Sequence, residues 1–180
     1  MLNKLILPTA LIESTHTLEE FLECEQRGAT SILQHIFSTD LSHIPEGILK
    51  LAGERGTSVH ESIETWLQGG ELDFFFEYKE WAKGFDKFLE SIETIQPLGV
   101  ELRCVTEHVK GVIDFVGYID GELTMIDWKT SSNMSGETRL SAELQLQLYA
   151  YMLSECYGID VDKVAVVSVQ KNKFRRIDVE

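Results

Sequence analysis

Two aspartates and a lysine flank a short turn in the second half of this 180-residue chain. Asp120-Gly121 is a dipeptide typical of a two-residue type I′ hairpin turn, because glycine tolerates positive φ. Pairing residues symmetrically about this turn predicts that Asp114 lies opposite Asp127. Lys129 then lies on the same strand face as Asp127, opposite Val112. Like charges directly opposite each other destabilise a strand pair, so a purely structural hairpin would disfavour this arrangement.

The neighbours of the two aspartates along both strands are apolar, which predicts that the carboxylates are partly buried. Paired carboxylates in such a place suit a hard divalent cation such as Mg²⁺. Taken alone, they fit a solvated strand face equally well. Lys129 favours the cation, because a structural lysine would pair with one aspartate and leave the other unpaired. A lysine at this position would orient a water molecule or stabilise a developing negative charge.

The elements that must position these residues follow from hydrophobic periodicity and from turn signals. A capping box at 17–20 predicts a first helix that ends near Gly28. The remaining predictions are helices over 47–68, 74–95 and 140–157, and strands over 100–106, 111–119, 122–128, 164–169 and 174–179. This order, with helices first, predicts an α/β fold with a mixed sheet.

Composition narrows the class of protein. Hydrophobic residues make up 43% of the chain, and no apolar run is long enough to span a bilayer. Three scattered cysteines predict reduced thiols, in keeping with a cytoplasmic protein of a bacterium or of a phage-infected cell. We expect one domain over residues 1–180, with an N-terminal helical segment (1–50) before a core (51–180) that carries the motifs. We expect no membrane partner.

The hairpin residues resemble a known family. Asp114, twelve intervening residues and then Asp127-Trp128-Lys129 resembles the D-x(n)-(D/E)-x-K core of the PD-(D/E)XK nuclease superfamily. Gly111-x-x-Asp114 followed by Asp127-x-Lys129-Thr130 is similar to its RecB-like exonuclease branch. Two further motifs of that branch occur in the same order along the chain, a helical histidine in the segment 56–64 and a Q-x-x-x-Y motif at 145–149.

The resemblance implies a restriction-endonuclease-like core and a set of roles. Catalysis falls to Asp114, Asp127 and Lys129. His60, Asp114, Asp127 and a main-chain carbonyl at Trp128 would hold Mg²⁺ or Mn²⁺. Substrate or supporting contacts are implied for Glu101, Thr130, Ser131, Gln145 and Tyr149.

Each motif outside the hairpin also has a plainer interpretation. His60 fits a half-buried helix histidine, Glu101 an exposed strand glutamate, and Gln145 with Tyr149 a polar stripe on a helix. Several RecB-like relatives hold an iron–sulfur cluster with four cysteines, and because this chain has three we expect none. Phage exonucleases and the mitochondrial genome maintenance exonuclease, which lack the cluster, are the nearer comparison.

The function implied is a metal-dependent deoxyribonuclease, an exonuclease acting on DNA ends or single strands in DNA processing, repair or recombination, with a helicase or recombination protein as a possible partner. The net charge of −14 opposes non-specific attraction to phosphates. It favours local engagement of an end or a single strand, with modest and salt-sensitive affinity. Seven cations are candidates for a local patch: Arg103, Lys110, Arg139, Lys171, Lys173, Arg175 and Arg176.

Two other functions fit the sequence. The first is a catalytically inactive nuclease-fold module that binds nucleic acid or serves as a scaffold. The second is an interaction protein whose acidic surface attracts basic partners. Divalent metal binding combined with strand cleavage distinguishes the nuclease from both.

Overall fold

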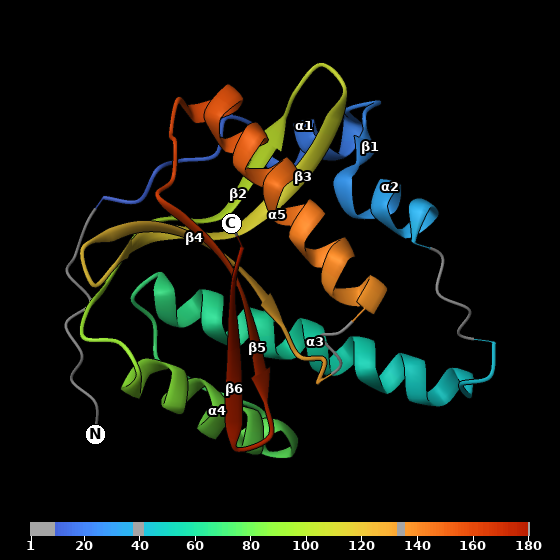
Figure 1. Cartoon of the computed structure of the whole chain (residues 1–180), viewed down its shortest axis with the longest axis vertical. Coiled ribbons are helices and arrows are strands. Elements are labelled where there is room, and N and C mark those ends of the chain that lie inside the picture. The colour runs from blue at the N-terminus through green and yellow to red at the C-terminus, as the bar shows by residue number, and fades with distance from the viewer. Residues whose placement is uncertain (1–9, 38–41, 133–135, 180) are drawn as a thin grey trace.

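The strands of this protein are apolar on both faces, and helices therefore cover the sheet on both sides (Figure 1). The computed structural model describes residues 10–37, 42–132 and 136–179. Its elements are α1 (Leu18–Glu23), β1 (Arg27–Gly28), α2 (Ala29–Ile36), α3 (Glu46–Leu67), the 3-10 helix η1 (Phe76–Tyr78), α4 (Lys79–Glu90), β2 (Ile95–Val105), β3 (Val109–Ile119), β4 (Glu122–Lys129), α5 (Gly136–Tyr157), β5 (Lys163–Gln170) and β6 (Lys173–Val179).

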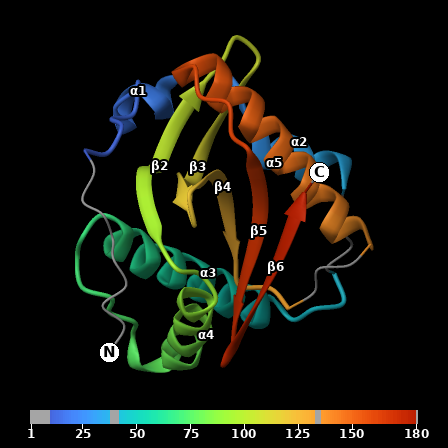
Figure 2. The same cartoon turned by 60° about the vertical axis from the view of Figure 1, so that its left-hand side comes forward.

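Two apolar cores hold the layers together. Helices α3 and α4 bury Ile63, Phe85 and Phe88 against one face of the sheet, where Trp128 lies edge-on to both phenylalanine rings. Helix α5, assisted by α2, buries its own apolar residues, among them Leu146, against the other face. Figure 2 shows the two helical layers separated by the sheet. The mixed α/β fold predicted from the sequence is confirmed.

The central hairpin has the predicted turn and register. Asp120 and Gly121 both have positive φ, 51° and 87°, as a type I′ turn requires. Strands β3 and β4 pair antiparallel from Ile119–Glu122 to Phe115–Ile126. Beyond that pair β4 runs parallel to β5, where Lys129 lies opposite Ser168.

The β3–β4 ladder ends at Phe115–Ile126, one pair short of the predicted pair Asp114–Asp127 and three pairs short of Val112–Lys129. Neither predicted pair is therefore part of the ladder, although Asp114 and Asp127 line the same cavity. Beyond Phe115–Ile126 the two strands separate. The separation opens a space beside Asp114.

The strand pair β2–β3 changes face next to this space. Val100 packs under α3 and α4, whereas Leu102 packs under α5, although residues two apart in a regular strand share a face. The residue between them, Glu101, has a φ of 51°, which is unusual for a residue with a side chain. The two neighbours of Asp114 on β3 divide between the same two cores. Glu101 and Asp114 thus lie where the chain passes from one layer to the other.

The N-terminal part differs most from the sequence-based prediction. The capping box at Thr17 is present, but α1 ends at Glu23 because Cys24 is extended, with ψ of 133°. Strand β1 takes the place of the end of the predicted first helix, and helix α2 follows where no individual element was predicted. The third predicted helix, 74–95, shortens to α4, and its last residue, Ile95, opens β2. Pro97 lies inside β2 at a break in the register, a position where proline is tolerated.

No helix in the described parts of the chain is long and apolar enough to cross a membrane. All three cysteines are free thiols. Cys104 donates to the Leu102 carbonyl, and Cys156 donates to the Val105 carbonyl.

Candidate active site

A cavity of about 380 Å³ opens at the space where β3 and β4 separate. Lys110 of β3 pairs with Val105 of β2 and also with Gly28 of β1, so β1 and β2 lie on opposite edges of β3. Strand β4 occupies the β1 edge, but only from Phe115 onward. The stretch 111–114, which lies between these two pairings, forms one wall of the cavity. The other lining residues include His60, Asp127, Lys129, Gln145 and Tyr149.

Three polar side chains form a closed network in this cavity. The Lys129 ammonium lies 3.0 Å from Asp127 Oδ1 and 2.8 Å from Oδ2. It also donates to Gln145 Oε1 at 3.3 Å, and Gln145 Nε2 donates to Asp127 Oδ1 at 3.0 Å. Asp127 and Gln145 are 3% and 8% exposed, so these contacts lie away from bulk water. The carboxylate and the ammonium are thereby fixed relative to each other.

Asp114 joins this network to helix α3. Its Oδ2 accepts a hydrogen bond from the main-chain N–H of Trp128 at 2.8 Å and lies 3.7 Å from His60 Nδ1. Because Asp114 is at the point where β3 changes face, it borders the cavity on the α5 side and a second one on the α3 side. The residues predicted on separate elements, His60, Asp114, Asp127, Lys129 and Gln145, are brought together here.

The electrostatics of the site follow from burial and from two neighbouring carboxylates. Burial, reinforced by the negative charge of Asp127, raises the pKa of Asp114 well above its usual range. Burial lowers the pKa of His60, which keeps the imidazole neutral and able to act as a ligand near pH 7. Burial alone would lower the pKa of Lys129, but the Asp127 carboxylate outweighs it and raises that pKa. The lysine is therefore charged.

The residues present fit a divalent cation. Asp127 Oδ2, although close to the Lys129 ammonium, accepts no hydrogen bond from the described residues despite being buried. Two carboxylates and one neutral imidazole are donors suited to Mg²⁺ or Mn²⁺. Trp128 borders the α3-side cavity while its ring is packed in the core, so its main chain is the part that faces the cavity. Within the described residues, no three His, Cys, Asp or Glu side chains already converge as a compact metal cluster.

The second cavity, of about 820 Å³, contains most of the remaining predicted residues: Glu101, Thr130 and Ser131. Glu101 is half-buried rather than exposed. Burial, with the nearby charge of Glu64, raises its pKa to about 7. Glu64 was missed in the sequence analysis, although it is four residues after His60 and shares its helix face.

Tyr149 and Gly111 close the first cavity. Tyr149 is buried, which raises the pKa of its phenol, and its hydroxyl lies 3.4 Å from Thr30 Oγ1 of α2. A Cβ at Gly111 would lie 2.8 Å from the Tyr149 ring, so only glycine allows this close approach. Thr30 belongs to a helix without a recognisable motif, and no signal in the sequence pointed to it.

Four of the seven candidate cations are engaged by other groups of the protein, although one of them, Lys110, also lines the first cavity. Arg103 donates to the His16 carbonyl, Lys110 donates to the carbonyls of Phe21 and Cys24, and Arg139 pairs with Glu143. Arg176 pairs with Asp178. Lys171 and Lys173 instead line a third cavity, which is described below.

The fold and the site together define an α/β protein with a buried centre of two carboxylates, a lysine and an imidazole. Residues 17–178 match the family model of the PD-(D/E)XK nuclease superfamily, and the chain belongs to that superfamily. Proteins of this family are typically phosphodiesterases that use divalent metal ions and act on nucleic acid.

A comparison with curated proteins found no match. Among the solved structures that resemble this chain is one described as the crystal structure of SSO0001. It has 16% sequence identity and a TM-score of 0.42, over 92% of this chain and 70% of that chain.

Proposed function

We propose that this protein is a Mg²⁺- or Mn²⁺-dependent deoxyribonuclease whose active centre consists of Asp114, Asp127 and Lys129. The observation that supports this most is the network in which Lys129 contacts both oxygens of a buried Asp127 while Asp114 lies across the same cavity. If the three charged groups were purely structural, their desolvation in one cavity would cost folding free energy with no functional gain.

The residues have separate roles in this proposal. Asp114, Asp127, His60 and the main-chain carbonyl of Trp128 would hold the metal, which supplies polarisation of the scissile phosphate and a more acidic bound water. Lys129 orients the attacking water or stabilises the charge that develops on the phosphate. Gln145 holds Lys129 and Asp127 in register, and Tyr149 supports that side of the cavity. Glu101, Thr130 and Ser131 border the path of the substrate.

The substrate form follows from charge. Two divalent ions would leave the chain strongly negative, so long duplex DNA is attracted weakly, and an end or a single strand that enters the cavity is favoured. We therefore propose an exonuclease of the RecB-like branch, formed by residues 1–180 as one domain. It would act in the cytoplasm in DNA processing, repair or recombination, and a helicase or recombination protein that exposes ends would supply its substrate.

The test uses end-labelled single- and double-stranded DNA, with either end blocked, and Mg²⁺ or Mn²⁺. We expect cleavage by the natural protein that blocking one end abolishes. Asp127→Asn, which keeps the shape of the side chain, should lose at least about 100-fold in rate. Full activity of Asp127→Asn would remove Asp127 from the active centre. No cleavage with any metal, despite binding of DNA, would instead favour the inactive nuclease-fold module.

A further inference from the structure

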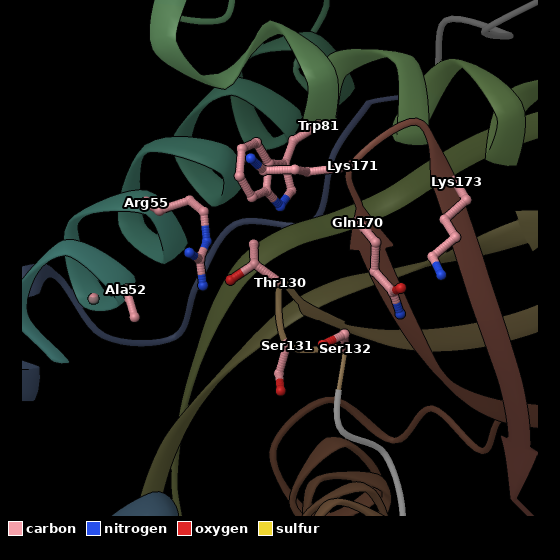
Figure 3. Close-up of a pocket in the computed structure, with 10 residues that line it drawn as sticks. Ala52, Arg55, Trp81, Thr130, Ser131, Ser132, Gln170, Lys171 and Lys173 are labelled. Carbon is pink, nitrogen blue, oxygen red and sulfur yellow. The ribbon is translucent and has the colours of Figure 1, made fainter. Parts of the chain in front are cut away.

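A third cavity, of about 660 Å³, is lined by residues of α3 and α4, of the segment after β4 and of the β5–β6 turn region (Figure 3). It shares Gly53, Thr130 and Ser131 with the cavity on the α3 side, which in turn shares His60, Asp114 and Lys129 with the first cavity. We refer to this series of adjoining hollows as the groove. The lining of the third cavity includes three cations, Arg55, Lys171 and Lys173, and among the described residues it includes no aspartate or glutamate. In a chain with a net charge of −14, this is a local reversal of sign.

The cations are arranged around one indole. The Arg55 guanidinium lies 5.2 Å from the centre of the Trp81 ring, and Lys171 Nζ lies 5.0 Å from it. Figure 3 shows Arg55 pointing from α3 toward Thr130, with Lys171 extending across Trp81. Attraction to the ring offsets part of the repulsion between the two cations. It does not supply a counter-charge.

The cations lack enough anionic partners within the described residues. Arg55 Nε is buried without a hydrogen-bond partner there, and neither Arg55 nor Lys173 forms an ion pair there. Lys171 has only a partly exposed contact with Glu80 at 3.4 Å. A buried N–H without an acceptor is costly. The three cationic side chains that line the cavity suit it to an anion that arrives from outside.

The position of these cations is firmly set. A Cβ at Gly84 of α4 would lie 2.1 Å from the main-chain oxygen of Gln170, so α4 and the β5–β6 turn are in close contact. Asn172 N–H donates to the Glu80 carbonyl at 2.7 Å, which anchors the turn between Lys171 and Lys173. On the other side, the Ser168 hydroxyl donates to the Ser131 carbonyl and holds the segment after Lys129 against β5.

We propose that this basic pocket binds a phosphate group of a nucleic-acid strand. The bond to be cut, in the same strand, would then lie at Lys129. The inference rests on the proposed nuclease function for the identity of the strand. For the site itself it rests on the three cations that line the pocket, on Arg55 Nε, which has no hydrogen-bond partner among the described residues, and on the shared lining residues. An internal phosphodiester and a terminal phosphate carry the same chemistry for this pocket. Arg55 and Lys173 are its principal contacts, because Glu80 competes for Lys171.

The experiment measures binding without cleavage, in EDTA, with three single-stranded oligonucleotides: one with a 5′-phosphate, one with a 3′-phosphate and one with neither. The variant is Arg55→Gln/Lys173→Ala. Its matched control is Lys83→Ala/Lys87→Ala, which removes the same charge from exposed positions on α4. Thermal melting shows whether the double variant folds. If it does not, Lys173→Ala alone replaces it, because Lys173 is exposed and lies outside the cores.

We expect the double variant to bind about tenfold more weakly than its control, with a salt dependence shallower by about 1.4 in the log–log slope, as for two lost phosphate contacts. Weakening with all three oligonucleotides identifies an internal phosphate, and weakening confined to one end-phosphorylated strand identifies a terminal phosphate. Equal affinity of the variant and its control, or no binding by the natural protein, would overturn the proposal that this pocket binds a phosphate.

Cleavage separates this proposal from the proposed function. If the natural protein cuts DNA and the double variant keeps the KM of its control, the pocket assignment is wrong and the nuclease stands. If the natural protein does not cut DNA but binds it through Arg55 and Lys173, the nuclease is wrong and the pocket stands.

Discussion

The two ends of the groove differ in charge and in how many of their polar groups already have partners. The acidic end is the network of Asp127, Lys129 and Gln145, and the basic end is the pocket lined by Arg55, Lys171 and Lys173. At the acidic end, Asp127, Lys129 and Gln145 contact one another at distances of 2.8–3.3 Å, and the side chains of Asp127 and Gln145 are buried. At the basic end, Arg55 and Lys173 have no ion-pair partner in the described residues. Because the polar groups of the acidic end already bind one another, that end suits a small cation that displaces few of these contacts. An end with unmet donors suits a larger anion that brings the contacts with it.

Loss of Lys129 should produce the largest difference between the two ends. Lys129→Ala is expected to lower kcat about 100- to 1,000-fold with little change in KM, because its ammonium acts on the charge that develops during the reaction. Lys173→Ala should raise KM and leave kcat nearly unchanged. Single-turnover cleavage of a labelled strand measures both. A change in KM alone for Lys129→Ala would make the two ends equivalent binding sites.

Metal binding should be confined to the acidic end. Mg²⁺ or Mn²⁺ at about 100 times its Kd is expected to stabilise the natural protein by about 2.7 kcal/mol, since only the folded state assembles the ligands. Thermal melting with and without metal measures this. Asp114→Asn should lose the stabilisation, and Arg55→Gln/Lys173→Ala should keep it. Equal stabilisation of Asp114→Asn and the natural protein would remove Asp114 as a ligand.

Packing should also differ between the ends. Gly111→Ala, which places a methyl group 2.8 Å from the Tyr149 ring, is expected to destabilise the protein by about 1–3 kcal/mol. Gly53→Ala at the basic end is the matched control. It meets no atom within 4 Å and lies within helix α3, so it should stabilise the protein by up to about 1 kcal/mol. Denaturant unfolding compares the two, and a tolerated Gly111→Ala would mean that the acidic end has room to adjust.

The smallest expected effect concerns pH. The pKa of Glu101 is raised to about 7, so the folded state keeps a proton that the unfolded state has lost. This contribution to stability is complete below about pH 4.5 and disappears as the pH rises through 7. Glu101→Gln lacks this titration, and in EDTA its melting temperature should fall less than that of the natural protein between pH 5 and 8. The difference corresponds to about 1–2 kcal/mol after allowance for solvent. Parallel pH profiles would show that Glu101 is ionised throughout.

Local rules accounted for the parts of the site that lie close together in sequence. The Asp120-Gly121 turn sets the register that carries Asp114 and Asp127 to the same cavity. The i, i+4 spacing of Gln145 and Tyr149 places both in the cavity wall. The early end of the β3–β4 ladder was not foreseen, because the symmetric pairing about the turn does not say where a ladder stops.

The basic end shows the limit of sequence reasoning more clearly. Seven cations were considered for a local patch, and nothing in their sequence context separated Lys171 and Lys173 from Arg103 or Lys110. The separation comes from main-chain carbonyls that the fold brings to Arg103 and Lys110. Arg55 was overlooked because its partner, Trp81, lies on another helix.

The hydrogen bond from Ser168 to the Ser131 carbonyl has a consequence for any chain that occupies the whole groove. It ties the segment that follows β4 to the strand that carries Gln170, and so helps to fix the span from Lys129 to the β5–β6 turn. If the basic end binds a phosphate as proposed, such a groove would work as a ruler. A polymer gripped at the basic end would be presented to Lys129 at one fixed count of its repeating units.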